Sequence, residues 1–457
     1  MKMLRLTQNQ QQQLKRHLFS GDGNESVALA LCGRLSNGDR EILCVHRIEP
    51  VPDKDCAERS ETRVQWDPRP FQALFEEAAS KGMGILKIHS HPSGFEEFSE
   101  TDDHSDKELF KSLHGWTDDG LPHCSAVMLP SGKIFARHVS PDGFFLPVDR
   151  VAVTGDSITL FDSQTNTEIL EAQIRTAQAF GEATTSQLGV LTIGVVGCSG
   201  TGSWVIEQLV RLGVGRLILV DPDIVKKKNL NRIVNSSEEH AHNGEFKVNA
   251  LAEILEHHGT GTSITTYPKL IFEREVSDAL GACDVLFGCV DSIEGRNYLN
   301  RIATFYSIPY FDLGVRLDAD GEGGVSNVSA VVNYLIPDGS SLLSRKSYSA
   351  ESLRVDSLRR CDPERYADEE KDGYIKGSKV ESPAVISVNG FCATAAVNEF
   401  LARIHPFRLG KLSEERQQQF DLVNSFWIYK GHSTPCPLLS SKTGRGNMSP
   451  YLDQVTS

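Results

Sequence analysis

The sequence predicts an α/β protein in which an α+β domain is followed by a domain built on a doubly wound, largely parallel sheet. Two patterns support this prediction. The first 149 residues mix strand-like runs, one pair of them joined by a hairpin signal, with short helical runs, whereas strands and helices alternate after residue 170. The length of 457 residues fits two to four domains. We expect a first domain at 1–149, a linker at 150–170, a second domain at 171–410 and a C-terminal extension at 411–457, whose Ser/Thr/Gly-rich tail after Pro435 is loose.

Composition narrows the class of protein. Hydrophobic residues make up 39% and charged residues 24%, so each domain can build a core. The net charge of −14 would repel a polyanion, which argues against nucleic acid as a partner. The N-terminus lacks the apolar core of a signal peptide, and there is no apolar run of about 18 residues. Ten scattered cysteines suit a reducing compartment. We therefore expect a cytoplasmic protein without a membrane partner.

The elements of the first domain follow from local patterns. Residues 26–35 and 40–48 are strand-like, and Asn37-Gly38 between them is a hairpin turn signal. Residues 71–82 have apolar residues at helical spacing and end in a glycine. The next run, 84–91, has the character of a buried strand.

The second domain begins with a helix near residue 171. Strands are expected at 191–197, 216–221 and 284–291, separated by helices, and further strands at 307–315 and 325–337 continue the sheet. Residues 338–381 are polar and too long for an ordinary loop, which indicates a functional or mobile crossing segment. Residues 384–404 return to a buried helical pattern.

A metal site is predicted in the first domain. His89 and His91 are two residues apart on the expected strand, so both imidazoles point to one side. Asp102 follows after a glycine-containing loop that can return its carboxylate to the same place. Two histidines and one carboxylate with an open fourth position are typical of catalytic zinc. Alternatively, the histidines are a surface pair, and Ser99 with Asp102 forms a helix N-cap, which is compatible with a ligand role.

The whole string, H-x-H followed by seven residues and S-x-x-D, resembles the motif of the JAB/MPN (JAMM) metalloproteases. This resemblance covers about residues 18–145 and implies cleavage of peptide or isopeptide bonds after ubiquitin-like modifiers. It implies zinc at His89, His91 and Asp102, Glu25 as general base, and Ser99 as a hydrogen-bond donor to the oxyanion. The early strand departs from the family pattern, because its glycine, Gly33, comes one residue late.

A nucleotide site is predicted in the second domain. A strand runs into a glycine-rich turn and a helix, an arrangement that suits phosphate binding. Asp221 ends the next strand at a distance typical of a ribose-binding carboxylate. The turn alone would equally suit a nicotinamide dehydrogenase. Polar and cationic residues at regular intervals beyond Asp221 favour a triphosphate with magnesium. The glycines of the turn are Gly197, Gly200 and Gly202.

Together these residues resemble the Rossmann-like ThiF adenylation domain of ubiquitin-activating enzymes and sulfur-carrier adenylyltransferases, over 171 to about 407. The resemblance implies ATP and Mg²⁺ as cofactors and a homodimer. It assigns the ribose to Asp221, the phosphates to three polar residues, Mg²⁺ to Asp291, and a reach into the partner's site to Arg175. The three phosphate contacts are Asn229, Arg232 and Lys247.

Two departures from the ThiF pattern stand out. Ser199 replaces the second glycine of the turn, which requires a negative φ at this residue. Ser341 and Ser344 stand where many relatives have two cysteines of a structural zinc site, so we expect no such zinc in the second domain.

Activating enzymes that pass a modifier onwards carry a cysteine on a crossing segment. Cys361 lies in the polar segment 338–381 beside Arg359 and Arg360, which would favour its thiolate. Cys392 is surrounded by small apolar residues, which indicates a buried helix position. Cys361 is therefore the candidate nucleophile, with Cys392 or no thioester as alternatives.

The resemblances imply a bifunctional enzyme of a bacterial ubiquitin-like system. It would adenylate and capture the modifier's C-terminus, cleave bonds after that modifier, and work with a conjugating enzyme, as in systems associated with antiphage defence. The alternative is processing and adenylation of a sulfur-carrier protein for cofactor or amino-acid synthesis. A third hypothesis is a binding module with degenerate sites that only scaffolds the modifier.

Overall fold

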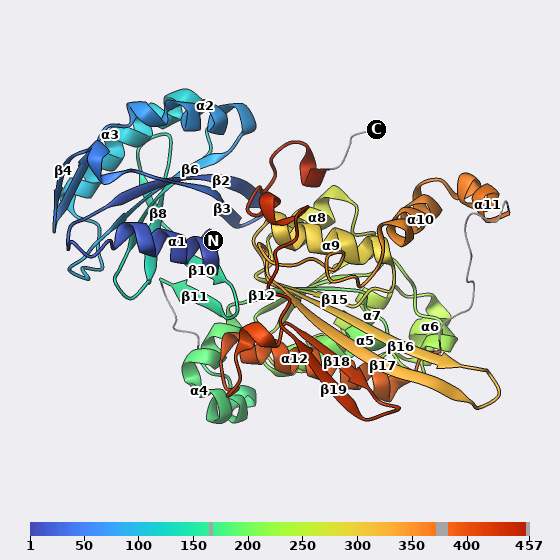
Figure 1. Cartoon of the computed structure of the whole chain (residues 1–457). Coiled ribbons are helices and arrows are strands. Elements are labelled where there is room, and N and C mark those ends of the chain that lie inside the picture. The colour runs from blue at the N-terminus through green and yellow to red at the C-terminus, as the bar shows by residue number, and fades with distance from the viewer. Residues whose placement is uncertain (164–167, 372–382, 454–457) are drawn as a thin grey trace.

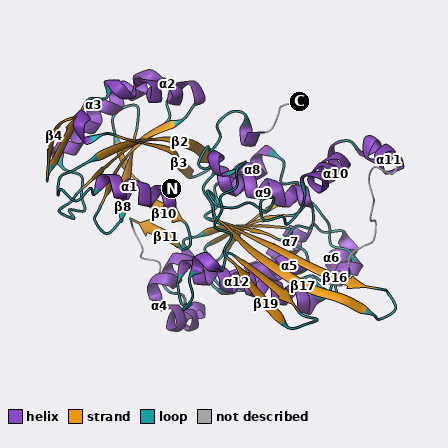
Figure 2. Cartoon of the chain, in the orientation of Figure 1, coloured by secondary structure: helices purple, strands orange, loops and turns teal. Residues whose placement is uncertain are grey.

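The computed structural model describes residues 1–163, 168–371 and 383–453, and two β-sheets meet at one junction within it (Figure 1). Helices flank both sheets, and long antiparallel strands extend from the second sheet away from the junction (Figure 2). No helix in the described part of the chain combines the length and apolar character needed to cross a bilayer.

The first domain is built on a sheet of nine strands among the described residues, in the order β11-β10-β1-β3-β2-β6-β7-β8-β9. Helix α1 packs on one face, and α2 and α3 pack on the other. The strands are β1 Lys2–Thr7, β2 Val27–Asn37, β3 Arg40–Pro50, β6 Gly84–Ser90, β7 His123–Met128, β8 Ile134–Val139, β9 Phe145–Pro147, β10 Arg150–Thr154 and β11 Ile158–Asp162. A separate hairpin has strands β4 Cys56–Ser60 and β5 Arg63–Trp66, and the helices are α1 Gln8–Leu18, α2 Gln72–Lys81 and α3 Glu100–Thr117.

Local patterns in this domain are confirmed, but the domain boundary differs from the expected one. Strands β2 and β3 form the predicted hairpin, and α2 ends at Gly82 in the left-handed conformation. Residues 150–162, expected in a linker, instead form β10 and β11. Strand β10 pairs in parallel with β1, although the two segments are nearly 150 residues apart. No local sequence pattern predicts this contact. Residues 164–167 of the expected linker lie outside the described residues.

The second domain has a doubly wound sheet, as predicted, in the order β14-β13-β12-β15-β16-β17-β18-β19 over the described residues. The first five strands in this order, from β14 to β16, pair in parallel. The last three, β17, β18 and β19, are added by antiparallel pairing. Helices α5, α7 and α12 pack on one face, and α8 and α9 pack on the other. The strands are β12 Thr192–Val196, β13 Arg216–Val220, β14 Ser263–Tyr267, β15 Val285–Gly288, β16 Tyr310–Ala319, β17 Val325–Leu335, β18 Gln417–Asp421 and β19 Phe426–Lys430. The helices are α4 Ile174–Gly189, α5 Gly200–Arg211, α6 Glu238–Asn243, α7 Lys247–Glu256, α8 Arg274–Gly281, α9 Ile293–Phe305, α10 Ala350–Cys361, α11 Pro363–Lys371 and α12 Ile386–Ile404.

The crossing segment and the C-terminal extension differ from the sequence expectation. The described part of 338–381 contains α10 and α11, neither of which has a buried residue, and 372–381 lie outside the described residues. In the expected extension, β18 and β19 complete the sheet. The tail after Pro435 is not loose, because residues 443–453, here called the C-terminal strap, lie between the domains. The Gly33 amide donates to the Gly444 carbonyl, and the Gly446 amide donates to the Phe305 carbonyl. Residues 454–457 lie outside the described part.

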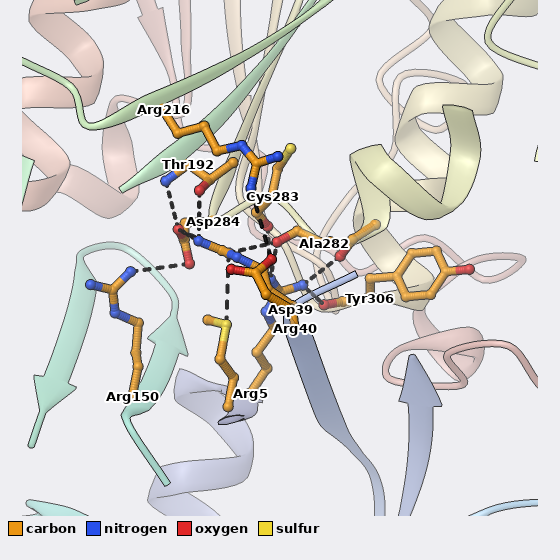
Figure 3. A network of polar contacts seen from close by, with 12 residues as sticks. Arg5, Asp39, Arg40, Arg150, Thr192, Arg216, Ala282, Cys283, Asp284 and Tyr306 are labelled. Carbon is orange, nitrogen blue, oxygen red and sulfur yellow. Dashed lines mark hydrogen bonds and ion pairs between the residues drawn. The ribbon is translucent and has the colours of Figure 1, made fainter. Parts of the chain in front are cut away.

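Three buried arginines from the first sheet hold the second domain at the junction (Figure 3). Arg5 donates hydrogen bonds to the carbonyls of Gly281, Ala282, Cys283 and Tyr306, which terminate helices α8 and α9. A cation satisfies these otherwise unpaired helix-terminal carbonyls and complements the helix dipoles.

The other two arginines share one carboxylate. Arg40 lies 3.3 Å and Arg150 lies 3.2 Å from Asp284, the residue that precedes β15. Arg40 also donates to the hydroxyl of Thr192, the first residue of β12. Breaking the junction would leave buried charges without their partners, which makes it a specific contact.

Candidate metal centre and candidate nucleotide site

The predicted metal ligands lie together at the end of β6. His89 is in the strand, His91 follows it, and Asp102 lies in the first turn of α3; one possible ligand atom from each falls within 4.8 Å of the others. The Nε2 atoms of the two histidines are 3.1 Å apart, and Nε2 of His89 is 2.9 Å from a carboxylate oxygen of Asp102. All three side chains are buried.

Hydrogen bonds around the cluster prepare its atoms for a metal. Nδ1 of His91 lies 2.8 Å from the Phe95 carbonyl, so Nδ1 carries the proton and Nε2 offers a lone pair. Nδ1 of His89 is buried without a hydrogen-bond partner among the described residues. Burial lowers the pKa of His89, which favours the neutral imidazole that a metal requires. Two imidazoles and a carboxylate are a donor set that fits zinc.

Ser99 and Asp102 cap helix α3 reciprocally. The Ser99 hydroxyl accepts from the Asp102 amide, and the Asp102 carboxylate accepts from the Ser99 amide and hydroxyl, each at 2.7 Å. The N-cap interpretation and the ligand interpretation therefore hold for the same residues. The single hydroxyl hydrogen of Ser99 is directed at Asp102, so the predicted oxyanion contact requires this side chain to rotate.

Glu25 lies on the same face of the sheet as the two histidines. Val27 is paired with His89 in antiparallel register. The Ser90 amide donates to the Ser26 carbonyl and the Ser26 amide donates to the Ser90 hydroxyl, so Glu25 is opposite His91. The β4 strand holds the backbone of Glu25 through the carbonyl of Ser60. Burial raises the pKa of Glu25 to about 7, which suits a group that exchanges protons near neutral pH.

A groove of about 620 Å³, here called the α3 groove, is lined by residues of α3, α2 and β5. Thr101 and Ser105 of α3, which flank Asp102 in sequence, line it. Its apolar wall includes Trp66, Phe75 and Trp116. The candidate metal ligands are not among its lining residues.

The glycine-rich turn lies between the carboxyl ends of β12 and β15. Gly197 has a φ of 89°, and a Cβ there would lie 2.5 Å from the Cys289 carbonyl oxygen, so only glycine fits. Cβ atoms at Gly200 and Gly202 would meet Asn389 and the Gly197 carbonyl at 2.2 and 1.8 Å. Ser199 has a φ of −98°, which satisfies the condition set by the sequence. Helix α5 starts at Gly200, where its free amides can bind phosphate.

The polar residues predicted around the nucleotide are partly engaged with one another. The Asp221 carboxylate accepts from the amides of Cys198 and Asp223, and Lys247 lies 3.4 Å from it. Burial raises the pKa of Asp221 despite these partners. Lys247 also pairs with Asp223 at 2.7 Å. The lysine is thus held at the mouth of the turn by carboxylates until an anionic ligand arrives.

The other predicted nucleotide residues differ in their placement. Asn229 is buried and its carbonyl oxygen caps a short helix, whereas Arg232 is close enough to the turn that its Cδ would lie 3.3 Å from a Cβ at Gly200. Asp291 is exposed and directly follows Val290, whose amide lies against Gly197. Arg175 is on the exposed side of α4 and contacts Gln178. It does not reach the turn of its own chain.

Asn389 of α12 is a site residue that sequence reasoning missed. Its side-chain oxygen accepts from the Thr201 hydroxyl at 3.3 Å, and its amide nitrogen lies against Gly200. The helical run contains two asparagines, and the signal was the one at a buried helical position, Asn389, whereas Asn398 is exposed. Such a residue is buried only where it has a hydrogen-bond partner.

A second groove, here called the cationic groove, lies beyond the turn and has a volume of about 680 Å³. Arg345 makes hydrogen bonds to neutral acceptors, two hydroxyl or amide side chains and two carbonyls. Two arginines of the groove are paired with carboxylates, Arg296 with Asp312 at 2.6 Å and Arg316 with Asp318 at 2.9 Å, so Arg345 is the arginine most available to an anion. The basic residues of the groove are Arg296, Arg316, Arg345, Lys346, Lys430 and His432, against one acidic residue, Asp421.

The candidate cysteines differ in exposure. Cys361 is exposed at the C-terminus of α10, and Arg360 pairs with Glu294 at 2.6 Å instead of with the thiol. Arg360 is therefore not available to stabilise a Cys361 thiolate, as the sequence had led us to expect. The C-terminus of a helix also disfavours an anion. Cys392 is buried, which raises the pKa of its thiol to about 12. Ser341 donates to the sulfur of Cys436 and exchanges hydrogen bonds with Ser344.

Two family profiles match the chain. That of the ThiF family matches residues 170–436, more than half of the chain. The chain belongs to the ThiF family. The profile of prokaryotic homologs of the JAB domain matches residues 7–138, so this ThiF protein carries a JAB domain at its N-terminal side.

Curated relatives of this ThiF protein match over a limited length. Ubiquitin-like modifier-activating enzyme 5 of Culex quinquefasciatus is 32% identical over 145 residues, 29% of this chain and 36% of the relative. Adenylyltransferase and sulfurtransferase MOCS3 of Mus musculus is 34% identical over 114 residues, 25% of this chain and 24% of the relative. The SAMP-activating enzyme E1 of Haloferax volcanii is 26% identical over 32% of this chain and 49% of the relative. The chain thus spans between a quarter and a half of these relatives.

Solved structures with a similar arrangement include E. coli MccB with ATP. It has a TM-score of 0.45 and 16% sequence identity, and the match covers 62% of this chain and 76% of that chain. SeMet PaaA has a TM-score of 0.42 and 17% identity over 60% of this chain and 78% of that chain.

Proposed function

We propose that this ThiF protein acts on the C-terminus of a ubiquitin-like modifier with two opposing activities. The ThiF domain adenylates the terminal carboxylate, and the JAB domain hydrolyses the bond that follows the modifier's last glycine. The observation that carries the proposal is the buried His89–His91–Asp102 cluster facing Glu25, in a chain whose other domain belongs to the ThiF family.

The adenylation reaction joins a carboxylate to AMP. An oxygen of the modifier's carboxylate attacks the α-phosphorus of ATP, a P–O bond breaks, and pyrophosphate leaves. Asp221 would bind the ribose, and Lys247, Arg232 and Asn229 the phosphates. Asp291 would hold Mg²⁺, which supplies charge neutralisation of the phosphates when bound.

The cationic groove supports the binding of an acidic C-terminus. Arg296 lies five residues after Asp291, so the groove begins where the magnesium ligand is expected. A modifier tail that ends in a carboxylate is attracted by Lys346 and by Arg345, whose recorded hydrogen bonds go to neutral acceptors. The relatives' names also fit, since one is a ubiquitin-like modifier-activating enzyme.

The hydrolytic reaction adds water across a C–N bond and yields a carboxylate and an amine. His89, His91 and Asp102 would hold zinc, which supplies Lewis-acid activation when bound. Glu25 takes a proton from the attacking water and passes it to the leaving amine. Ser99 keeps Asp102 in place and donates to the oxyanion when its hydroxyl rotates. The α3 groove holds the modifier beside this site.

Two proposed partners complete this function. A conjugating enzyme would receive the modifier, and a second copy of the chain would supply Arg175 to each nucleotide site. We place the protein in a bacterial ubiquitin-like system with a role in antiphage defence.

One specific observation favours a second candidate, the processing and adenylation of a sulfur carrier. Arg360 is occupied by Glu294, which weakens the case for a reactive Cys361, and one relative is named an adenylyltransferase and sulfurtransferase. In that pathway the acyl adenylate reacts with a sulfur donor and becomes a thiocarboxylate.

The mass of the modifier after incubation with ATP and Mg²⁺ tests these functions. Candidate ubiquitin-like proteins are those encoded beside this gene, each tested as a precursor and as the form ending in glycine. Loss of the extension followed by an adenylate or a cysteine adduct supports the first function, and a thiocarboxylate after addition of sulfide supports the second. Unchanged mass of every candidate overturns both and favours a scaffold.

A further inference from the structure

Helix α3 carries one of the three candidate metal ligands, and its buried residues change character along its length. Four residues of the helix are buried, and they form one stripe at helical spacing. The last two, Phe110 and Leu113, pack into an apolar cluster with α2. The first two, Asp102 and Asp106, are carboxylates. The amino-terminal half of α3, which places Asp102 at the metal site, is therefore held against the sheet mainly by polar contacts.

Lys87 is the partner of Asp106 on the strand that carries the histidines, β6. Its ammonium nitrogen lies 2.7 Å from a carboxylate oxygen of Asp106 and 3.2 Å from the Ser105 hydroxyl. Lys87 is 3% exposed and Asp106 is fully buried. Lysine is almost never buried to this extent unless it is paired. The proposed hydrolysis uses neither residue.

Two contacts, one beside the other, connect α3 to β6. Asp106 pairs with Lys87, and a carboxylate oxygen of Asp102 lies 2.9 Å from Nε2 of His89. Residues 87 and 89 point to the same face of the strand and are roughly 6.6 Å apart. Residues 102 and 106 share a face of the helix and are about 6 Å apart along its axis. Because these spacings match, both contacts form together in only one register of α3, which runs antiparallel to β6.

Arg137 of β8 holds Asp106 from another direction. Its guanidinium lies 2.7 Å from the second carboxylate oxygen of Asp106 and 2.5 Å from Asp103. It also lies over the ring of Phe98, in the loop that precedes α3, at 3.8 Å from the centroid. Asp106 therefore keeps one cationic partner when the other is removed, which allows Lys87 to be tested by itself.

Stability alone does not account for charges at these positions. Replacing a buried ion pair by apolar side chains of similar volume is often neutral or stabilising. The apolar stripe of α3 could therefore have continued through position 106. An ion pair adds a directional contact that favours one register of the helix on the strand, as single buried polar residues do in coiled coils.

We infer that Lys87 and Asp106 are positioning residues of the metal centre. Their ion pair sets the register of α3 along β6, and this register places the Asp102 carboxylate beside Nε2 of both His89 and His91. The inference rests on the metal site of the proposed function. It deepens that function by naming the contact that holds two separate segments of the chain in ligating geometry. In this role neither residue touches the metal.

The zinc affinity of the full-length protein tests the inference. Lys87→Met removes the contact with β6 and leaves Asp106 paired with Arg137. We expect this variant to fold and to bind zinc roughly 10–100-fold more weakly in competition with a chromogenic chelator, the usual effect of losing a group that orients a metal ligand. The double variant Lys87→Met/Asp106→Leu replaces the ion pair by apolar side chains and should show a similar loss. Wild-type affinity in either folded variant overturns the inference.

Asp162→Asn is the matched control. It breaks a buried ion pair with Arg150 in the same sheet, and its strand, β11, carries no candidate metal ligand. This variant should lose stability and keep the zinc affinity of the wild type. An equal loss of affinity in the control would mean that any weakening of the domain releases zinc, which overturns the inference.

Cobalt gives a second readout that does not depend on affinity. With Co²⁺ at saturation, a displaced Asp102 carboxylate should shift the visible bands of Lys87→Met, whereas those of Asp162→Asn should match the wild type. Unchanged bands in Lys87→Met overturn the inference. A wild type that binds no metal overturns the proposed metal site and the inference with it. Metal binding without cleavage of any modifier counts against the proposed function alone.

Discussion

Arg40 of β3 and Asp284 of the second domain lie 3.3 Å apart, and both are buried. Arg40 is beside the turn of the β2–β3 hairpin in the first sheet, and Asp284 directly precedes β15, a central strand of the second sheet. The contact therefore joins the two sheets. Arg150 approaches the other oxygen of the same carboxylate. One aspartate therefore compensates two buried cations from two different strands.

Replacing Asp284 by asparagine should destabilise the protein by about 3 kcal/mol, because two buried guanidinium groups lose their counter-ion. Burial acts to raise the pKa of Asp284, but Arg40 and Arg150 outweigh it and hold the pKa at about 2. The carboxylate's contribution is therefore present above the unfolded pKa near 4 and is lost as the pH falls towards 2. Chemical denaturation from pH 7 down to pH 3 measures this, and an unchanged difference between wild type and variant over that range would contradict the assignment.

The metal assignment predicts different outcomes for two neighbouring residues. His89→Ala should lose bound zinc and cleavage, whereas Glu25→Gln should keep zinc and lose cleavage by roughly 10²–10⁴-fold, the usual contribution of a general base. Zinc content by mass spectrometry and cleavage of a modifier fusion measure these effects. His257→Ala, an exposed histidine in the second domain, is the matched control and should change neither. Wild-type cleavage by Glu25→Gln would show that the base is misassigned.

The contact of Gly33 with the C-terminal strap leads to a prediction about stability. A Cβ at this position would lie 2.2 Å from the Arg445 carbonyl carbon, so Gly33→Ala should push the strap away and destabilise the protein by about 1–3 kcal/mol. Gly115→Ala in α3 is the control, because a Cβ there meets no atom within 4 Å and alanine should stabilise the helix by about 0.5–1 kcal/mol. Thermal unfolding compares the two variants. Equal stability of Gly33→Ala and the wild type would mean that the strap is not packed against β2.

Arg175 predicts complementation between subunits. It is exposed on α4 and its recorded contact is with Gln178 of the same helix, which leaves it available to a partner's site. Mixing Arg175→Ala with Asp291→Ala chains gives heterodimers in half of the particles, each with one intact site, so about a quarter of wild-type exchange should return. ATP–pyrophosphate exchange and sedimentation measure activity and assembly. A monomer without restored activity would exclude this arrangement.

Cys361 predicts a thioester with the modifier. Its sulfur is exposed on a polar helix, where it is free to receive an acyl group, although Arg360 is engaged with Glu294. A dithiothreitol-sensitive adduct should form with ATP, Mg²⁺ and the modifier, and Cys361→Ala should abolish it while pyrophosphate exchange continues. Cys392→Ala is the control, since that thiol is buried and its raised pKa makes it unreactive. An adduct that persists in Cys361→Ala would contradict the assignment.

The sequence by itself determined the chemistry that depends on short spacings. His89 and His91 share a face because strand residues alternate, and the glycine-rich turn precedes α5 because a strand runs directly into it. The two families and the order of their domains follow from the same local motifs, which two profiles match.

Contacts between distant segments were decided only by the tertiary structure. Glu25 faces His91 through the register of β2 and β6, Arg5 terminates helices nearly 300 residues away, and β10 joins the first sheet instead of a linker. The need for glycine at position 33 becomes apparent only in the folded chain, because the backbone of Arg445 lies where a Cβ would be. These contacts depend on how the helices and strands pack, and the packing is determined by the whole core. Spacing along the chain determines only which nearby residues share a face of one helix or strand.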